Sequence, residues 1–187
     1  MVIFYWFVWI VGLFICLIIY ITYRIEFLDK FYWNLFWIGF FLGLSWELPI
    51  SLLNVISIYP FVRFITPIPL PEPFSFMVMA ITTSFWDAGL FLLGVLFVKL
   101  LCKQPYFEKF KVCELTILII FGQVSELIVE LLSTLSNGWE YIVYWWNPRL
   151  FIFYGNNITL LPQLIWLIAP IAFYYFTIRL KSGFLAT

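Results

Sequence analysis

The chain has 187 residues, of which 65% are hydrophobic and 11% are charged. Soluble domains average about 45–50% apolar and about 25% charged residues, so this composition predicts an integral membrane protein. The formal net charge of +0 offers no basic footprint for a nucleic acid, and the absence of histidine excludes a His-ligated haem, an HExxH zinc site and a Ser-His-Asp triad. Three cysteines without metal-ligand or CxxC spacing complete the expectation of no metal and no cofactor.

Five segments are long enough to span a bilayer, which requires roughly 20 apolar residues. The first has neither a basic n-region nor a small-residue cleavage site, so we expect a membrane helix rather than a cleaved signal peptide. No internal repeat and no soluble domain interrupts the pattern. The fold expected is therefore an all-α bundle of five transmembrane helices that forms a single domain over residues 1–187. The expected spans are Val2–Tyr23, Phe31–Ile56, Phe74–Leu101, Val112–Leu135 and Asn157–Leu180.

Two of the connections have unusual compositions. The stretch Thr66–Pro73 alternates proline with other residues and cannot be helical, because proline removes backbone donors and restricts its neighbours to extended geometry. We interpret it as a stiff linker; the alternative is a lid across an outward-facing cavity mouth. The stretch Trp139–Pro148 is rich in Trp and Tyr, which favour the headgroup region, and predicts an interfacial segment lying on the bilayer.

The distribution of Lys and Arg predicts the orientation, because these residues favour the cytoplasmic side. Only Arg63 and Arg149 belong to the second and fourth connections. The bias predicts an outside or luminal N-terminus and a cytoplasmic C-terminus, in the endoplasmic reticulum membrane of a eukaryote or the inner membrane of a bacterium. The other eight basic residues lie in or beside the first and third connections and near the C-terminus: Arg24, Lys30, Lys99, Lys103, Lys109, Lys111, Arg179 and Lys181.

Four carboxylic acids lie deep within the expected spans with no basic residue among them: Glu47, Asp87, Glu126 and Glu130. An ionisable group at membrane depth is costly and usually faces an interior cavity. Without cationic partners, such carboxyls are expected to hold or share protons. The alternative is that they serve as interhelical hydrogen-bonding groups, but such bonds contribute only about 0.6 kcal/mol on average in membranes. We therefore expect a functional cavity.

Residues three or four positions apart share one face of a helix, and lipid cannot satisfy polar faces, so these faces should turn inward. The first helix has few polar residues and is expected to be a peripheral support. Tryptophans beside the acids would stabilise a carbocation by cation–π attraction, although ordinary packing also explains aromatic residues in a membrane. The expected catalytic residues are Glu47, Asp87 and Glu126. The expected substrate-binding residues are Trp46, Trp86, Thr83, Gln123, Glu130, Gln163, Trp166 and Asn54.

Several short motifs carry a resemblance to a known family. They are Gly43-x-x-Trp46-Glu47, Ile81-Thr82-Thr83-Ser84-Phe85-Trp86, Phe121-Gly122-Gln123 after Lys103-Gln104-Pro105, and Gln163-Leu164-Ile165-Trp166 followed by Pro170. With them the chain resembles the EXPERA family of four-helix membrane modules, and within it the emopamil-binding-protein type, which are sterol Δ8–Δ7 isomerases with an extra N-terminal helix. A Trp-Glu pair on one helix and an Asp on another are also similar, over less of the chain, to membrane-bound terpene cyclases.

The resemblance implies a four-helix module over residues 31–181 and an accessory helix and loop over residues 1–30. It implies that a protonated carboxyl attacks a ring double bond, with Glu47 as the acid of the second helix. Gln163 and Trp166 would position the substrate, and Thr82 or Thr83 would assist. The histidine that the family has on its second helix has no counterpart here, and its third-helix glutamate is absent while Asp87 provides an acid instead.

Together these observations predict a membrane isomerase or cyclase that acts on a sterol-like or terpenoid lipid by carboxyl acid–base chemistry through a carbocation. The alternatives are a non-catalytic sterol- or lipid-binding protein, a proton- or cation-coupled carrier, and a structural subunit, so catalysis itself stays open. A carrier would need a homodimer to supply the symmetry that the chain lacks. The expected partners are an apolar lipid ligand, the lipid bilayer and, in that case, a second copy of the chain, but no nucleic acid.

Overall fold

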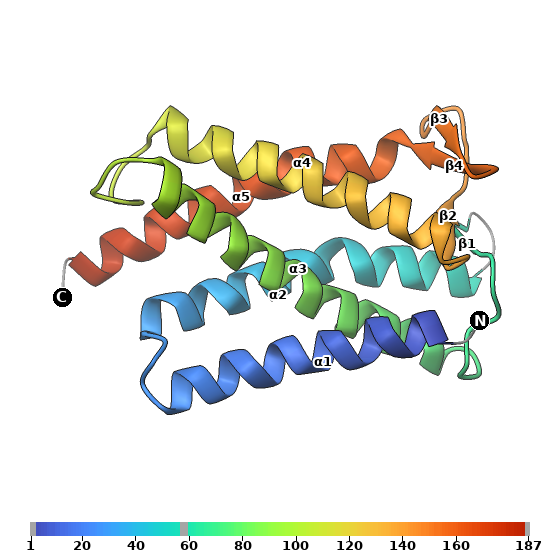
Figure 1. Ribbon diagram of the computed structural model, residues 1–187, viewed down its shortest axis with the longest axis horizontal. Helices are drawn as coiled ribbons and strands as arrows, with labels where there is room; N and C mark the ends of the chain where they lie inside the picture. The colour runs from blue at the N-terminus through green and yellow to red at the C-terminus, as the bar shows by residue number, and fades with distance from the viewer. Residues whose placement is uncertain (1–2, 57–59, 186–187) are drawn as a thin grey trace.

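The structure, a computed structural model, describes residues 3–56 and 60–185, and five long helices make up most of this part of the chain (Figure 1). Each helix is long and apolar enough to cross a membrane, which confirms the prediction of an integral membrane protein with five spans. The helices are α1 (Ile3–Arg24), α2 (Lys30–Ile56), α3 (Phe74–Leu101), α4 (Val112–Leu135) and α5 (Leu160–Leu185).

Most of the predicted helix boundaries are confirmed. Helices α3 and α4 begin and end at the predicted residues, and α2 begins one residue earlier than predicted. Val2, the predicted first residue of the first span, lies outside the described residues. The predicted limits of the last helix are wrong, because Asn156–Thr159 forms strand β4, so α5 begins only at Leu160, and because α5 continues past Leu180 to Leu185. Helix α1 ends at Arg24, one residue later than predicted.

The two ends of the bundle differ in structure (Figure 1). The short strands lie at the end where α1 begins, which we call the cap end. The α1–α2 and α3–α4 connections and the end of α5 lie at the opposite end, which we call the basic end because most of the Lys and Arg residues belong to it. Helix α3 is central and packs against α1, α2 and α4, whereas α5 packs against α4 and α2.

Two glycines of α2 allow its close approach to α3. A Cβ atom at Gly39 would lie 3.0 Å from the Cα atom of Ala88, and a Cβ atom at Gly43 would lie 2.7 Å from Oδ2 of Asp87. Small residues four positions apart form one smooth helix face, which lets two membrane helices pack backbone against backbone. This contact holds Asp87 directly against α2.

In the described part of the chain, four strands cover the cap end of the bundle. Strand β1 (Val62–Phe64) pairs antiparallel with β2 (Trp139–Tyr141), and β3 (Arg149–Phe153) pairs antiparallel with β4. The first part of the segment predicted to lie at the membrane interface forms β2, which pairs with β1 and contacts α4 at the cap end of the bundle. Strands β1 and β2 come from distant parts of the chain, so local composition gave no sign of their pairing, whereas β3 and β4 form a hairpin of neighbouring segments.

A buried carboxylate ties the strands together. The Glu140 side chain on β2 is 4% exposed and forms an ion pair with Arg63 on β1. It also accepts a hydrogen bond of 2.8 Å from the backbone N–H of Asn157 on β4. These contacts explain why Asn157 belongs to a strand, since the extended backbone brings its N–H to the carboxylate.

Replacing Arg63 with methionine should destabilise the cap. The change leaves the Glu140 carboxylate buried without its cation, and losing one partner of a charged hydrogen bond costs about 1–3 kcal/mol. We expect a lower melting temperature of the detergent-solubilised protein, and Arg63→Lys should recover part of the loss. Arg149→Met, which removes an exposed cation of the same cap, is the control. Equal melting temperatures for Arg63→Met and this control would contradict the conclusion that the Arg63–Glu140 ion pair stabilises the cap.

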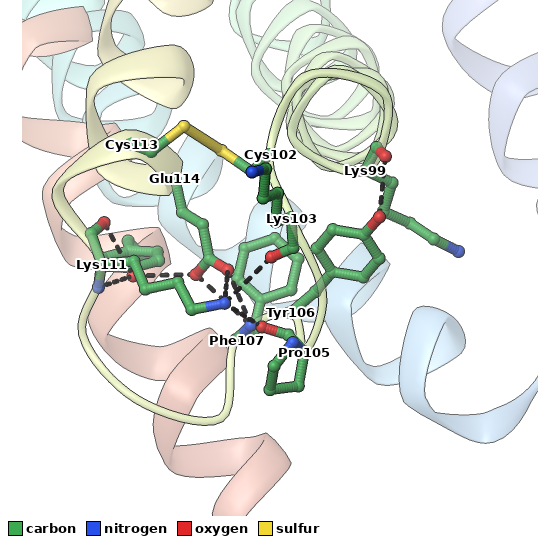
Figure 2. Close-up of a disulfide and its surroundings, with 10 residues drawn as sticks. Lys99, Cys102, Lys103, Pro105, Tyr106, Phe107, Lys111, Cys113 and Glu114 are labelled. Atoms are coloured by element: carbon green, nitrogen blue, oxygen red, sulfur yellow. Dashed lines mark hydrogen bonds and ion pairs between the residues drawn. A yellow bond between two sulfur atoms is a disulfide. The ribbon is translucent and has the colours of Figure 1, made fainter.

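A disulfide between Cys102 and Cys113 closes the α3–α4 connection at the basic end (Figure 2). Beside it lies Glu114, which is fully buried and accepts hydrogen bonds from the backbone N–H of Phe107 at 3.2 Å and from the Tyr174 hydroxyl at 2.9 Å. The Lys111 ammonium lies 3.8 Å from the same carboxylate. The connection is therefore anchored to α4 and α5 as a compact loop.

Candidate functional site

A cavity of about 760 Å³ lies inside the cap-end half of the bundle. Every described helix and strand β2 contribute to its walls, which are mostly apolar. Its volume falls within the roughly 300–1,000 Å³ that is typical of small-molecule sites. The lining residues are Ile3, Phe4, Phe7, Val8, Trp46, Glu47, Thr83, Trp86, Asp87, Leu90, Glu126, Val129, Leu132, Ser133, Leu135, Ser136, Trp139, Tyr141, Pro162, Ile165 and Trp166.

Three carboxylic acids from three helices face this cavity: Glu47 of α2, Asp87 of α3 and Glu126 of α4. Asp87 and Glu126 are buried, whereas Glu47 is half-buried. No Lys or Arg is among the residues that line the cavity in the described part of the chain. The structure therefore brings together the three acids that the sequence singled out for catalysis, in an apolar cavity whose described lining residues include no cation.

The three acids have few protein partners. Thr83 and Trp46 lie within interaction distance of the Glu47 carboxyl, and Trp46 also contacts Asp87. The Oδ2 atom of Asp87 is buried and has no hydrogen-bond partner among the residues the structure describes. Buried polar atoms without partners are rare in folded proteins. This oxygen lies against Gly43 of α2, so it belongs to the tight α2–α3 contact, at the edge of the cavity that Asp87 lines.

The predicted tryptophans also line the cavity. The indole N–H of Trp86 donates to the carbonyl of Val8 at 2.9 Å, which fixes the ring against α1. The ring of Trp166 stacks on Phe91 with 5.3 Å between centroids and meets Trp46 edge-on at 6.2 Å. The acids are thus surrounded by aromatic rings in fixed orientations.

Three of the predicted substrate-binding residues lie outside the cavity lining, in the contact between α4 and α5. The side-chain amide of Gln163 donates to Oε2 of Glu130 at 3.1 Å. The amide of Gln123 donates to the backbone carbonyl of Gln163 at 2.8 Å. Glu130 is buried within this network, so these three side chains join helices rather than face the cavity.

Asn54 also lies outside the large cavity and holds the strand that follows α2. Its Oδ1 accepts a hydrogen bond from the backbone N–H of Phe61 at 2.7 Å, and its Nδ2 donates to the carbonyl of Val62 at 3.1 Å. A smaller cavity of about 40 Å³ lies between Asn54, Glu47 and Tyr141. Asn54 therefore positions β1 above the acids.

Helix α1 packs mainly against α3, as expected for a peripheral helix, but four of its residues also line the cavity, which the sequence analysis did not predict. The α1 helix also anchors the linker and the turn after α4: the Tyr5 hydroxyl lies 3.0 Å from the carbonyl of Thr66 and 2.7 Å from that of Gly138. The Thr66 hydroxyl donates to the carbonyl of Asn137 at 2.6 Å. The proline-rich stretch Thr66–Pro73 does not line the cavity, which agrees with a linker rather than a lid.

Tyr141 of β2 is a cavity residue that the sequence did not single out. One tyrosine could not be recognised as a cavity residue from the sequence, because aromatic residues make up 24% of the chain. Burial raises the pKa of the Tyr141 phenol, and the neighbouring Glu126 and Glu47 carboxyls raise it further. Tyr141 therefore keeps its proton and offers an O–H donor at the cap side of the acids.

The raised pKa of Tyr141 predicts a loss of stability in alkali. The folded protein holds this proton where the unfolded chain, with a tyrosine pKa of about 10, releases it. The stabilisation is complete below about pH 10 and is lost as the pH rises from there towards the folded pKa. Thermal unfolding between about pH 8 and 11 should therefore show a steeper decline for wild type than for Tyr141→Phe. The exposed Tyr154, changed to Phe, is the control; parallel curves for all three proteins would contradict the prediction.

Comparison of the chain with protein-family models, curated proteins and solved structures finds no match. The resemblance to the EXPERA family therefore stays a prediction from short motifs. Of the residues to which it assigns roles, Glu47, Thr83 and Trp166 line the cavity, whereas Gln163 and Thr82 do not.

Proposed function

We propose that this chain is a membrane isomerase or cyclase that acts on a sterol-like or terpenoid lipid by carboxyl acid–base chemistry. The observation that carries the proposal is the convergence of Glu47, Asp87 and Glu126 on one apolar cavity that no Lys or Arg lines among the described residues. Acids placed in this way can exchange protons with a bound apolar molecule. The resemblance to sterol isomerases and terpene cyclases points to the same chemistry.

The proposed reaction is a proton relay through a carbocation. A protonated carboxyl donates its proton to a carbon–carbon double bond, which forms a C–H bond and leaves a cation on the neighbouring carbon. In an isomerase, a second carboxylate removes a proton from an adjacent carbon and forms the shifted double bond. In a cyclase, an internal alkene attacks the cation and closes a ring before that proton is lost. One proton enters and one leaves in each turnover, so the chemistry is balanced without a cofactor.

The surrounding residues have roles in this proposal. Asp87 is the preferred proton donor, because it is a buried carboxyl that lines the cavity and has no ion-pair partner among the described residues. Glu47 and Glu126 are the candidates for the base. The rings of Trp46, Trp86 and Trp166 would stabilise the cation, and a cation–π contact contributes about 0.5–2 kcal/mol.

Deuterium transfer from solvent tests the proposal. Purified protein in lipid vesicles is incubated in D₂O with a Δ8 sterol or with a linear isoprenoid alcohol, and the extracted lipids are analysed by mass spectrometry. An isomerase or cyclase that accepts the lipid produces an isomer carrying one solvent deuterium. Unchanged lipids of both classes, with no deuterium at carbon, would contradict the proposal.

A non-catalytic lipid-binding protein is the second candidate, and the same cavity favours it. It predicts that added lipid raises the melting temperature without any turnover, because a ligand that binds only the folded state stabilises it. Isomer formation would exclude this candidate in favour of the enzyme.

A further inference from the structure

The side chains that line the cavity and also reach the outer surface mark its opening. Four lining residues are exposed, and all four belong to α1 or α4: Ile3, Phe7, Leu132 and Leu135 are 79%, 54%, 53% and 47% exposed. Every other lining residue is buried or half-buried. Both helices pack against α3, so the opening lies on the side of the bundle, between the start of α1 and the end of α4. Both helix ends lie at the cap end (Figure 1). We call this opening the portal.

The cap closes the portal on the side of the strands. The Tyr5 hydroxyl is 2.7 Å from the carbonyl of Gly138 and so joins the start of α1 to the turn that follows α4. The ring of Phe4 packs against Trp139 of β2 with 5.3 Å between centroids. Above them, β1 and β2 are held together by the Arg63–Glu140 ion pair. The free route from the cavity therefore runs sideways, through a rim of exposed apolar side chains of two membrane-spanning helices.

The residues that line the cavity favour one class of lipid over others. Among the described lining residues, a phosphate or carboxylate headgroup would meet three carboxyls and no cation, so an anionic lipid is disfavoured. Ser136, near the portal, and Tyr141, under the cap, provide hydroxyl groups for a small polar end. Ser136 directly follows the end of α4, ten residues beyond Glu126, which separates the two by roughly 15 Å along the helix axis. A lipid with one uncharged polar end and an apolar body would thus place its body against the acids.

From this arrangement we propose that an uncharged membrane lipid with a single small polar group, such as an alcohol, enters the cavity sideways from the bilayer leaflet at the cap end, through the portal between α1 and α4. The polar end stays near Ser136 while the apolar body reaches Glu47, Asp87 and Glu126. The role of the three acids in this inference rests on the proposed function. The route of entry concerns lipid binding alone and does not require catalysis. It assigns to α1, the accessory helix, a part in admitting the substrate.

Photo-crosslinking in vesicles tests the route without any need for turnover. The protein is reconstituted with a diazirine-bearing sterol or with a diazirine-bearing isoprenoid alcohol, irradiated and digested, and the labelled peptides are identified by mass spectrometry. We expect labels on residues 3–8 and 129–136, which competition by the unlabelled alcohol reduces several-fold. A phosphatidylglycerol probe with the same diazirine should label only lipid-facing positions and should not be competed.

Two matched pairs of variants then test the portal itself. Leu132→Trp should narrow it and slow labelling of the cavity several-fold, whereas Ile128→Trp, on the same helix but outside the lining and 48% exposed, should not. Phe7→Ala should widen it and speed labelling, whereas Phe14→Ala on the same helix should not. Competed labelling that depends on these changes supports the portal even if no lipid isomer forms, and isomer formation is scored separately. Uncompeted labelling, or equal labelling of Leu132→Trp and Ile128→Trp, overturns it.

Discussion

Asp87→Asn should reduce deuterium transfer into lipid by about 10²–10⁴-fold, the range that general acid–base groups contribute to catalysis. The amide has nearly the same size as the carboxyl and keeps its packing against α2, but it cannot donate and accept a proton in turn. Folding should be retained, because Asp87 forms no ion pair with any described residue that the change would remove. Glu47→Gln and Glu126→Gln should each cause losses of the same order if both acids take part in the relay. The measurement is the initial rate of formation of deuterated isomer, with melting temperature recorded for each variant.

Two further acids serve as controls for this prediction. Glu108 lies exposed in the connection at the basic end, and Glu130 is buried outside the cavity. Glu108→Gln should leave the rate unchanged, and Glu130→Gln should affect stability more than rate because it alters the α4–α5 contact. A rate for folded Asp87→Asn within a factor of two or so of wild type would remove Asp87 from the relay. Losses that follow melting temperature across all variants would instead indicate a structural role for the acids.

Gly43→Val should separate α2 from α3 and destabilise the protein by about 1–3 kcal/mol, the usual cost of overpacking a tight contact. The added Cβ would lie 2.7 Å from Oδ2 and 3.0 Å from Cβ of Asp87, and 3.1 Å from the Cα atom of Ser84. Because Ser84 presents its backbone there, rotation of one side chain cannot relieve the contact. We therefore expect both a lower melting temperature and a lower rate of deuterium transfer, since Asp87 must move.

Gly183→Val is the matched control for the glycine, because a Cβ atom at Gly183 would meet no heavy atom within 4 Å. It introduces the same side chain into α5 with the same intrinsic effect on a helix. A melting temperature for Gly43→Val equal to that of Gly183→Val would show that the α2–α3 contact adapts freely.

The helices were predictable because their signal is local. Long apolar runs such as Phe74–Leu101 end at polar or proline-rich connections, and α3 and α4 match their predicted limits. The start of α5 was missed because Asn157 belongs to β4, which pairs with the neighbouring β3, and because its backbone N–H donates to Glu140, 17 positions away. Strands β1 and β2 pair across two helices, so their pairing has no local signal in the sequence.

The site was predictable in part for a similar reason. Helical spacing places polar residues on inner faces, and for Glu47, Asp87 and Glu126 the inner face is also the cavity wall. Spacing cannot distinguish a wall from a contact between two helices. Glu130 therefore had the same signal as Glu126 but lies in the α4–α5 contact. The contribution of α1 was hidden because its lining residues are apolar, and apolar residues in a membrane helix carry no sign of what they face.

The bridge between Cys102 and Cys113 bears on the compartment that the basic end faces. Protein disulfides persist in the periplasm, the lumen of the endoplasmic reticulum or outside the cell, whereas cytosolic glutathione and thioredoxin keep thiols reduced. The lysines around the bridge favour the cytoplasm instead, so the two features assign the same end of the bundle to opposite sides of the membrane. A stable bridge would give the N-terminus a cytoplasmic location and would require the chain to mature in an oxidising compartment. Intact cells can be labelled with a membrane-impermeant maleimide before and after reduction with an impermeant phosphine. The labelling of Cys102 and Cys113 then reports which side of the membrane the basic end faces.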